Sequence, residues 1–75
     1  MLTKIENTES LDQVFTALAN KHRREIVYSL GLHPASIAQL AYQQKLSLPA
    51  IHRHIVVLEQ AKLVQRKKVS KTNFI

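Results

Sequence analysis

Residues 36–60, SIAQLAYQQKLSLPAIHRHIVVLEQ, contain two runs of apolar residues at helical spacing, joined by a short polar turn. In the second run Ile51, Ile55 and Leu58 recur at spacings of four and three, which places them on one face of a helix. Ser47 can cap this helix with its hydroxyl, and the proline two residues later suits a first turn, where a missing N–H costs little. We therefore predict a short helix that begins at Ser47 and turns its apolar face inward.

The first run predicts a helix that begins after Ser36 and ends near Gln44. Ser36 and Gln39 have the spacing of a capping box, in which each residue's side chain bonds the other's backbone N–H. Lys45 to Ser47 then form a turn of the length found in helix-turn-helix units. Lys45 stands where a glycine would adopt a positive φ more easily, at a cost of about 1 kcal/mol. Together the two runs predict a helix-turn-helix.

The outer face of the second helix is the candidate reading surface. Pro49, His52, Arg53 and Val56 lie opposite the apolar stripe. Arg53 can fork onto guanine or clamp a phosphate, and His52 can contact a base or a phosphate; an ordinary solvated side chain is the alternative for each. Val56 is either an uncovered valine or a contact for a thymine methyl. His54 lies beside the apolar stripe, so we predict a buried structural histidine there.

The charge of the chain is segregated. The formal net charge is +6, yet in residues 1–44 four basic and four acidic side chains cancel. Residues 45–75 hold seven basic side chains against Glu59 alone. A one-sided field of this kind suits a polyanion, because each neutralised phosphate releases condensed counterions. A solvated surface that only keeps a small protein in solution is the alternative.

Two helices are expected before the helix-turn-helix. Residues 1–9 are predicted to form a flexible lead-in. Ser10 and a glutamine three residues later suggest a capping box and a helix over residues 10–19. Its apolar face comprises Leu11, Val14, Phe15 and Leu18.

Asn20 can cap the second helix, expected over residues 21–30. Gly31, the single glycine, is predicted to end it in a left-handed conformation. The helix has an exposed polar run near its start, where Arg23 can touch a phosphate. The core-facing residues of this helix are Ile26, Val27 and Leu30.

A basic β-hairpin is expected after the helix-turn-helix. Residues 63–68 mix apolar and basic residues like a half-buried strand, and residues 72–75 can pair back through a turn near Ser70. The connector at Pro34 can add one short strand to this sheet. Flexible ammonium groups suit sequence-independent attraction to phosphates, so three lysines of the hairpin are predicted phosphate contacts. They are Lys67, Lys68 and Lys71. The expected fold class is therefore mainly α with a small antiparallel β-hairpin, in one domain over residues 10–75.

Composition narrows the function further. The chain has no cysteine, so a disulfide framework and thiolate metal sites are excluded. His52 and His54 are two residues apart and point about 200° apart on a helix, so they cannot chelate one ion. We find no catalytic constellation, no apolar run near the roughly 20 residues of a membrane span, and no targeting segment. We expect a cytoplasmic protein that is no enzyme and needs no cofactor or metal.

Three segments resemble the ArsR-type winged helix-turn-helix transcription regulators: LANKHRREIVYSL (18–30), SIAQLAYQQKLS (36–47) and LSLPAIHRHIVVLEQAKLV (46–64). The resemblance extends over residues 11–75 and implies a winged helix-turn-helix of four helices and a wing. It also implies sequence-specific binding of double-stranded DNA and repression of a promoter by a homodimer that uses the first helix. Metal sensing through cysteine pairs, known in the family, does not carry over to a chain without cysteine.

The predicted function is therefore DNA binding by a transcriptional repressor. A protein–protein interaction module on the same fold is the alternative, because several outward residues of the reading helix have little capacity for hydrogen bonds. RNA binding is less favoured, since exposed aromatic residues that stack unpaired bases are not evident. Ser36 and Ser47 are primarily helix caps, and join the binding surface if those helix ends face phosphates. The candidate DNA-binding residues are Ser36, Ser47, Pro49, Ala50, His52, Arg53, Val56, Lys67, Lys68, Ser70 and Lys71.

Overall fold

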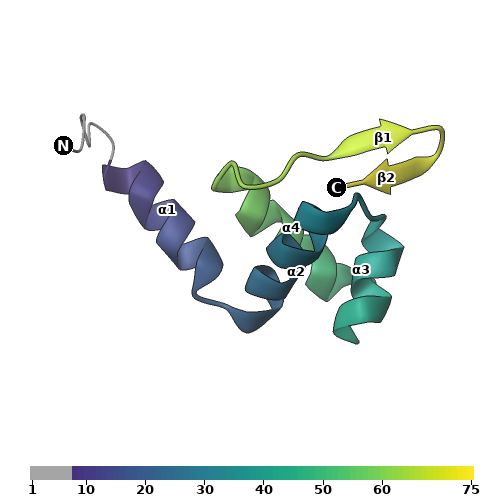
Figure 1. Cartoon of the computed structure of the whole chain (residues 1–75), viewed down its shortest axis with the longest axis horizontal. Coiled ribbons are helices and arrows are strands. Elements are labelled where there is room, and N and C mark those ends of the chain that lie inside the picture. The colour runs from purple at the N-terminus through teal and green to yellow at the C-terminus, as the bar shows by residue number, and fades with distance from the viewer. Residues whose placement is uncertain (1–7) are drawn as a thin grey trace.

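The computed structural model describes residues 8–75, apart from the side chain of residue 73. Its elements are α1 (Thr8–Leu18), α2 (Lys21–Leu32), α3 (Ile37–Gln44), α4 (Leu48–Gln60), β1 (Lys67–Val69) and β2 (Thr72–Phe74). In Figure 1, α1 lies at one end of the 42 Å long axis, α2 and α4 lie in the middle, and α3 and the hairpin lie toward the other end. The predicted fold class, mainly helical with one hairpin, is confirmed. Of the predicted lead-in, residues 1–7 lie outside the described part of the chain.

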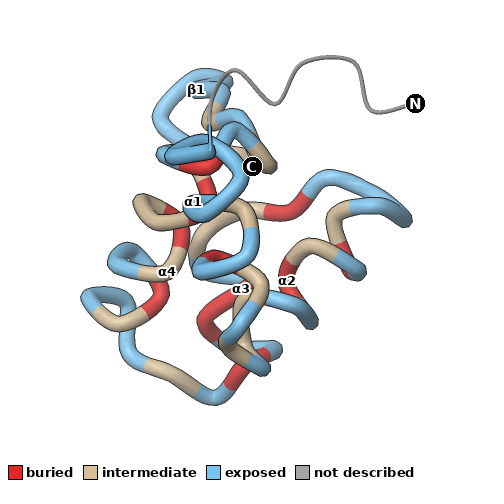
Figure 2. The backbone as a smooth tube through the Cα atoms, turned by 90° about the vertical axis from the view of Figure 1, so that its left-hand side faces the viewer, coloured by how far each residue is buried: buried red, intermediate tan, exposed pale blue. Residues whose placement is uncertain are grey.

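The core forms where the helices meet. In Figure 2 the buried stretches recur along the helices, whereas the hairpin is largely exposed. Ile51, Ile55 and Leu58 of α4 are all fully buried, which confirms the inward stripe of that helix. The buried apolar residues are Ala17, Ile26, Ala35, Leu40, Ala41, Ile51, Ile55, Leu58 and Ala61.

Local signals specify the helix-turn-helix. The Ser36 hydroxyl accepts from the Gln39 N–H at 3.1 Å, and the Gln39 side-chain oxygen accepts from the Ser36 N–H at 2.8 Å, so the predicted capping box is present. The Ser47 hydroxyl accepts from the Ala50 N–H at 3.3 Å. Between the two helices Lys45 adopts the predicted left-handed conformation, with φ 57° and ψ 42°. This turn directs α4 across α3.

The ends of the first two helices differ from the prediction. Helix α1 begins at Thr8, so Ser10 lies within its first turn and is not the N-cap. Helix α2 continues through Gly31, which has no positive φ and does not terminate it. The helix ends at Leu32. His33 follows as the C-cap with an extended backbone (φ −166°, ψ 157°), which is favoured because Pro34 clashes with a helical preceding residue.

The rest of the protein covers only part of the apolar face of α1. Ala17 is fully buried, and its small side chain lets α1 approach the neighbouring helices closely. Val14 and Leu18 are half-buried. Leu11 and Phe15 are 41% and 64% exposed. An apolar strip of α1 therefore remains uncovered in this chain.

The hairpin is shorter and more exposed than predicted. Strand β1 begins at Lys67 and not at residue 63, and its three residues are all exposed instead of half-buried. It pairs antiparallel with β2, and the turn contains Ser70 with φ 59°, close to the predicted turn. Leu63 and Val64 pack on the core as a connector, so their burial belongs to the helices and not to a sheet.

The hairpin is anchored at the start of α3. One isolated bridge joins Ser36 to Phe74, and the Ile75 N–H donates to the Ala35 carbonyl at 2.8 Å. The strand predicted at the connector near Pro34 is thus reduced to this single bridge. The anchor still fixes β2 beside the N-terminus of α3.

Candidate nucleic-acid interface

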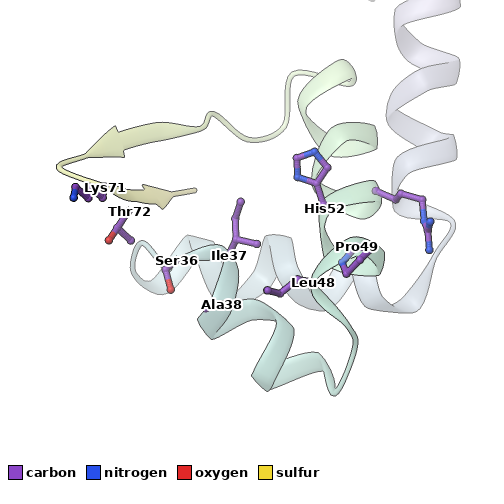
Figure 3. A pocket seen from close by; sticks show the side chains of 9 residues that line it. Ser36, Ile37, Ala38, Leu48, Pro49, His52, Lys71 and Thr72 are labelled. Carbon is purple, nitrogen blue, oxygen red and sulfur yellow. The ribbon is translucent and has the colours of Figure 1, made fainter.

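The starts of α3 and α4 and the end of the hairpin border one open depression (Figure 3). Its lining residues are Ser36, Ile37, Ala38, Leu48, Pro49, His52, Arg53, Lys71 and Thr72. The bridge from Ser36 to Phe74 places the hairpin at this position. Five predicted site residues are thus brought to one surface: Ser36, Pro49, His52, Arg53 and Lys71.

Exposed basic groups border this depression from two elements. His52 and Arg53 of α4 and Lys71 of the hairpin are all exposed. Among the side chains that the structure describes, none forms a hydrogen bond or ion pair with the Arg53 guanidinium or the Lys71 ammonium. Both cations are therefore available to an anionic ligand.

Six predicted residues lie outside the depression. Lys67 and Lys68 are exposed on β1, and Ser70 is exposed in the turn. Ser47 caps α4, while Ala50 and Val56 are half-buried. These residues can only extend the interface beyond the depression, and their roles stay predictions.

The sequence analysis missed four lining residues, Ile37, Ala38, Leu48 and Thr72. Three of them occupy the first turn of α3 or α4. Local sequence signals do not bring these residues together, because the three-residue turn joins the end of α3, and not its start, to the start of α4.

Arg23 is an internal tie, so the expectation of an exposed polar side chain at this position is wrong. Its Nε donates to the Ala17 carbonyl at 2.7 Å and its Nη2 to the Thr16 carbonyl at 3.1 Å. Its Nη1 lies 3.2 Å from Nδ1 of His54. These carbonyls belong to the last turn of α1, whose oxygens lack partners within the helix. Arg23 therefore ties α1 and α4 to α2.

The contact with Arg23 favours the neutral form of His54. A guanidinium only donates, so Nδ1 of His54 accepts in this contact and loses it when Nδ1 is protonated. Burial lowers the pKa of His54, and the nearby Arg23, His22 and Arg53 lower it further. The prediction of a structural histidine holds in kind, although His54 is half-buried and not fully buried.

His22 lies next to Arg23 and His54, and these three residues form the Arg23 cluster. Its ring lies 5.8 Å from that of His54, and its Nδ1 is 2.8 Å from Oε1 of the buried Gln44. Hydrogen bonds thus join α2 to both helices of the helix-turn-helix. Among the described residues no group of three or more potential ligands is placed to hold a metal ion.

One cation of the basic C-terminal half is neutralised internally. Arg66 Nη2 donates to Glu59 Oε1 at 2.9 Å, and the two side chains are only 25% and 31% exposed. This pair fixes the connector to the end of α4 and directs the chain into the hairpin. The outward positive charge therefore rests on Arg53 and the lysines.

A sequence model described as bacterial regulatory protein, arsR family, matches residues 20–66, which include α2, α3 and α4. The chain belongs to this family. The family consists of transcription regulators, and the predicted resemblance is confirmed. No helix in the described residues has the length and apolar character needed to cross a membrane.

Individual relatives agree with this assignment. The chain is 40% identical over 55 residues to the HTH-type transcriptional regulator Rv2034 of Mycobacterium tuberculosis. The matched segment covers 73% of this chain and 51% of that protein. The solved structure of an ArsR family transcriptional regulator matches with a TM-score of 0.83 and 29% identity, over 91% of this chain and 70% of that one. HlyU from Vibrio cholerae matches with a TM-score of 0.83 and 27% identity, over 95% and 77% respectively. The chain spans about half the length of the curated relatives it matches.

Proposed function

We propose that this arsR family chain binds double-stranded DNA sequence-specifically, with α4 in the major groove and the hairpin on the flanking backbone. The observation that carries the proposal is the shared surface of Arg53 and Lys71, two exposed cations supplied by separate elements. A reading helix flanked by a basic hairpin suits base contacts from the first element and phosphate contacts from the second. Its ligand being chromosomal DNA, the protein would act in the cytoplasm.

In this proposal α4 and the hairpin contact different parts of the DNA. Arg53 can bond guanine O6 and N7 bidentately, and His52 one turn of helix from the N-cap can contact a base or phosphate. Lys67, Lys68 and Lys71 are point charges on exposed backbone, which suits contact with phosphates of any sequence. Sequence preference should therefore depend on α4, and general affinity on the hairpin.

We further propose a homodimer that represses transcription. The uncovered strip of α1, with Leu11 and Phe15, is apolar surface that a second copy can bury. Two copies related by a two-fold axis present two reading helices, which suits a palindromic site. A dimer bound across a promoter would exclude polymerase.

The deciding experiment measures affinity for random duplex DNA against salt concentration. We expect a steep loss of affinity, with a log–log slope of about −0.9 for each phosphate contacted. Lys68→Ala should make this slope shallower by about one phosphate, whereas the matched variant Lys21→Ala, on a different element, should leave it unchanged. No binding at low salt would overturn the proposal and support the protein-interaction module.

A further inference from the structure

The lining of the depression contains apolar residues, here called its floor, and two cations, Arg53 and Lys71, here called its basic rim. Leu48 is 56% exposed on the first turn of α4. Pro49 and Ala38 beside it are exposed, and Ile37 is half-buried. None of these side chains can donate or accept a hydrogen bond. Figure 3 shows that they come from the starts of both helices of the helix-turn-helix.

The basic rim restricts what can occupy this floor. Arg53 and Lys71 line the same depression as the apolar residues, so an anionic partner that also carries apolar groups complements the depression best. In the major groove of DNA, the C5 methyl of thymine is the apolar group that a base pair presents between the phosphate backbones. The minor groove presents no such group. Duplex DNA rich in T·A pairs at the contacted positions therefore complements both the floor and the rim.

We propose that Leu48, supported by Pro49 and Ala38, reads thymine methyl groups in the major groove and so determines part of the sequence specificity. This inference rests on the proposed function, because it requires α4 to lie in that groove. Arg53 supplies the polar base contact on the same face. Val56, the residue first considered for a thymine methyl, lies outside the depression.

The test removes the methyl group and nothing else from the DNA. Duplexes that the protein enriches from a random pool are resynthesised with deoxyuridine in place of thymidine, one position at a time. Deoxyuridine keeps every hydrogen-bonding group of thymidine. We expect binding about fourfold weaker for each methyl that Leu48 covers, as for one buried methylene.

Variants of Leu48 assign the effect to this residue. For Leu48→Ala the thymidine and deoxyuridine duplexes should bind equally, because the side chain that covers the methyl is gone. Leu48→Met keeps an apolar chain of similar length and should restore the discrimination. Arg53→Ala should weaken both duplexes by the same factor. Because Leu48 is exposed, its truncation should leave the melting temperature nearly unchanged.

The outcomes separate this inference from the function beneath it. Specific binding with no penalty for deoxyuridine, or an enriched site without T·A pairs, would overturn the role of Leu48 while DNA binding stands. A penalty that persists in Leu48→Ala would assign the methyl contact to another residue and overturn the inference equally. Failure to bind any duplex at low salt would overturn both proposals.

Discussion

A histidine–arginine pair lies on each side of α4, and the two pairs behave differently. On the inner side His54 contacts Arg23 of α2. The Arg23 guanidinium donates to two α1 carbonyls and to the His54 imidazole. On the outer side His52 and Arg53 are exposed at the depression. The same two residue types thus serve as an internal tie in one place and as a candidate reading surface in the other.

The difference lies in the acceptors that the fold brings nearby. The C-terminal turn of α1 leaves carbonyl oxygens without helical partners, and the path of α2 places Arg23 directly against them. No comparable acceptor among the described residues faces Arg53. A cation becomes structural where tertiary packing supplies its acceptors, and remains available for a ligand where packing supplies none.

The largest expected effect is on the inner side. Arg23→Ala removes three hydrogen bonds from a charged donor and should lower the free energy of unfolding by about 2–3 kcal/mol. The melting temperature should fall by roughly 10–20 °C for a domain of this size. The matched control is Arg53→Ala, expected within about 0.5 kcal/mol of the parent. Equal destabilisation of the two variants in chemical denaturation would remove the distinction between the sides.

The next effect is on the outer side and is measured with DNA. Arg53→Ala should weaken binding to the enriched duplex by about 1–3 kcal/mol and affect a scrambled duplex less, because a bidentate base contact is sequence-specific. Lys68→Ala should weaken binding to both duplexes alike. Titrations at one fixed salt concentration measure the affinities of both variants and of the parent for both duplexes. Equal proportional losses for both variants on both duplexes would refute the division of labour between α4 and the hairpin.

Features decided by neighbouring residues were predictable from the sequence. The capping box of Ser36 and Gln39, the cap at Ser47 and the left-handed Lys45 each depend on a few adjacent residues and were predicted. The buried stripe on α4 follows from spacing alone. These features fixed the helix-turn-helix, and with it most of the candidate surface.

Features decided by distant residues were not predictable. Arg23 was expected at the surface because its carbonyl partners on α1 are six and seven positions away, beyond a turn, and His54 is farther still. The first strand was expected to be half-buried over residues 63–68. In the structure the helical core covers Leu63 and Val64 and not Lys67 and Lys68, and the sequence pattern does not show this difference. Gly31 was expected to end α2, whereas the following His33–Pro34 step does so.

A smaller effect tests whether stability by itself changes DNA affinity. Gly31 lies within α2, has no positive φ, and a Cβ added there meets nothing within 4 Å. Gly31→Ala should therefore stabilise the fold by about 0.5 kcal/mol through backbone entropy. Its affinity for the enriched duplex should equal that of the parent. A gain in stability accompanied by a change in affinity would mean that the stability of α2 and the DNA affinity are coupled.

The smallest effect concerns pH and compares the two histidines of α4. The folded pKa of His54 lies below its ordinary value of 6.5, so the folded state binds fewer protons than the unfolded chain in this range. The contribution of the neutral histidine is therefore complete above pH 6.5 and is lost as the pH falls from 6.5 toward the lowered pKa. Protonation would also place a cation against Arg23, His22 and Arg53.

His54→Gln keeps an oxygen that can accept from Arg23 but does not titrate. Unfolding free energies measured between pH 7.5 and 5 should therefore decline less for His54→Gln than for the parent. His52→Gln, the matched change on the exposed side, should keep the parental decline because it leaves the Arg23 cluster intact. If His52→Gln flattened the profile and His54→Gln did not, the exposed histidine would be the one that senses protons, and the contrast between the two sides of α4 would be reversed.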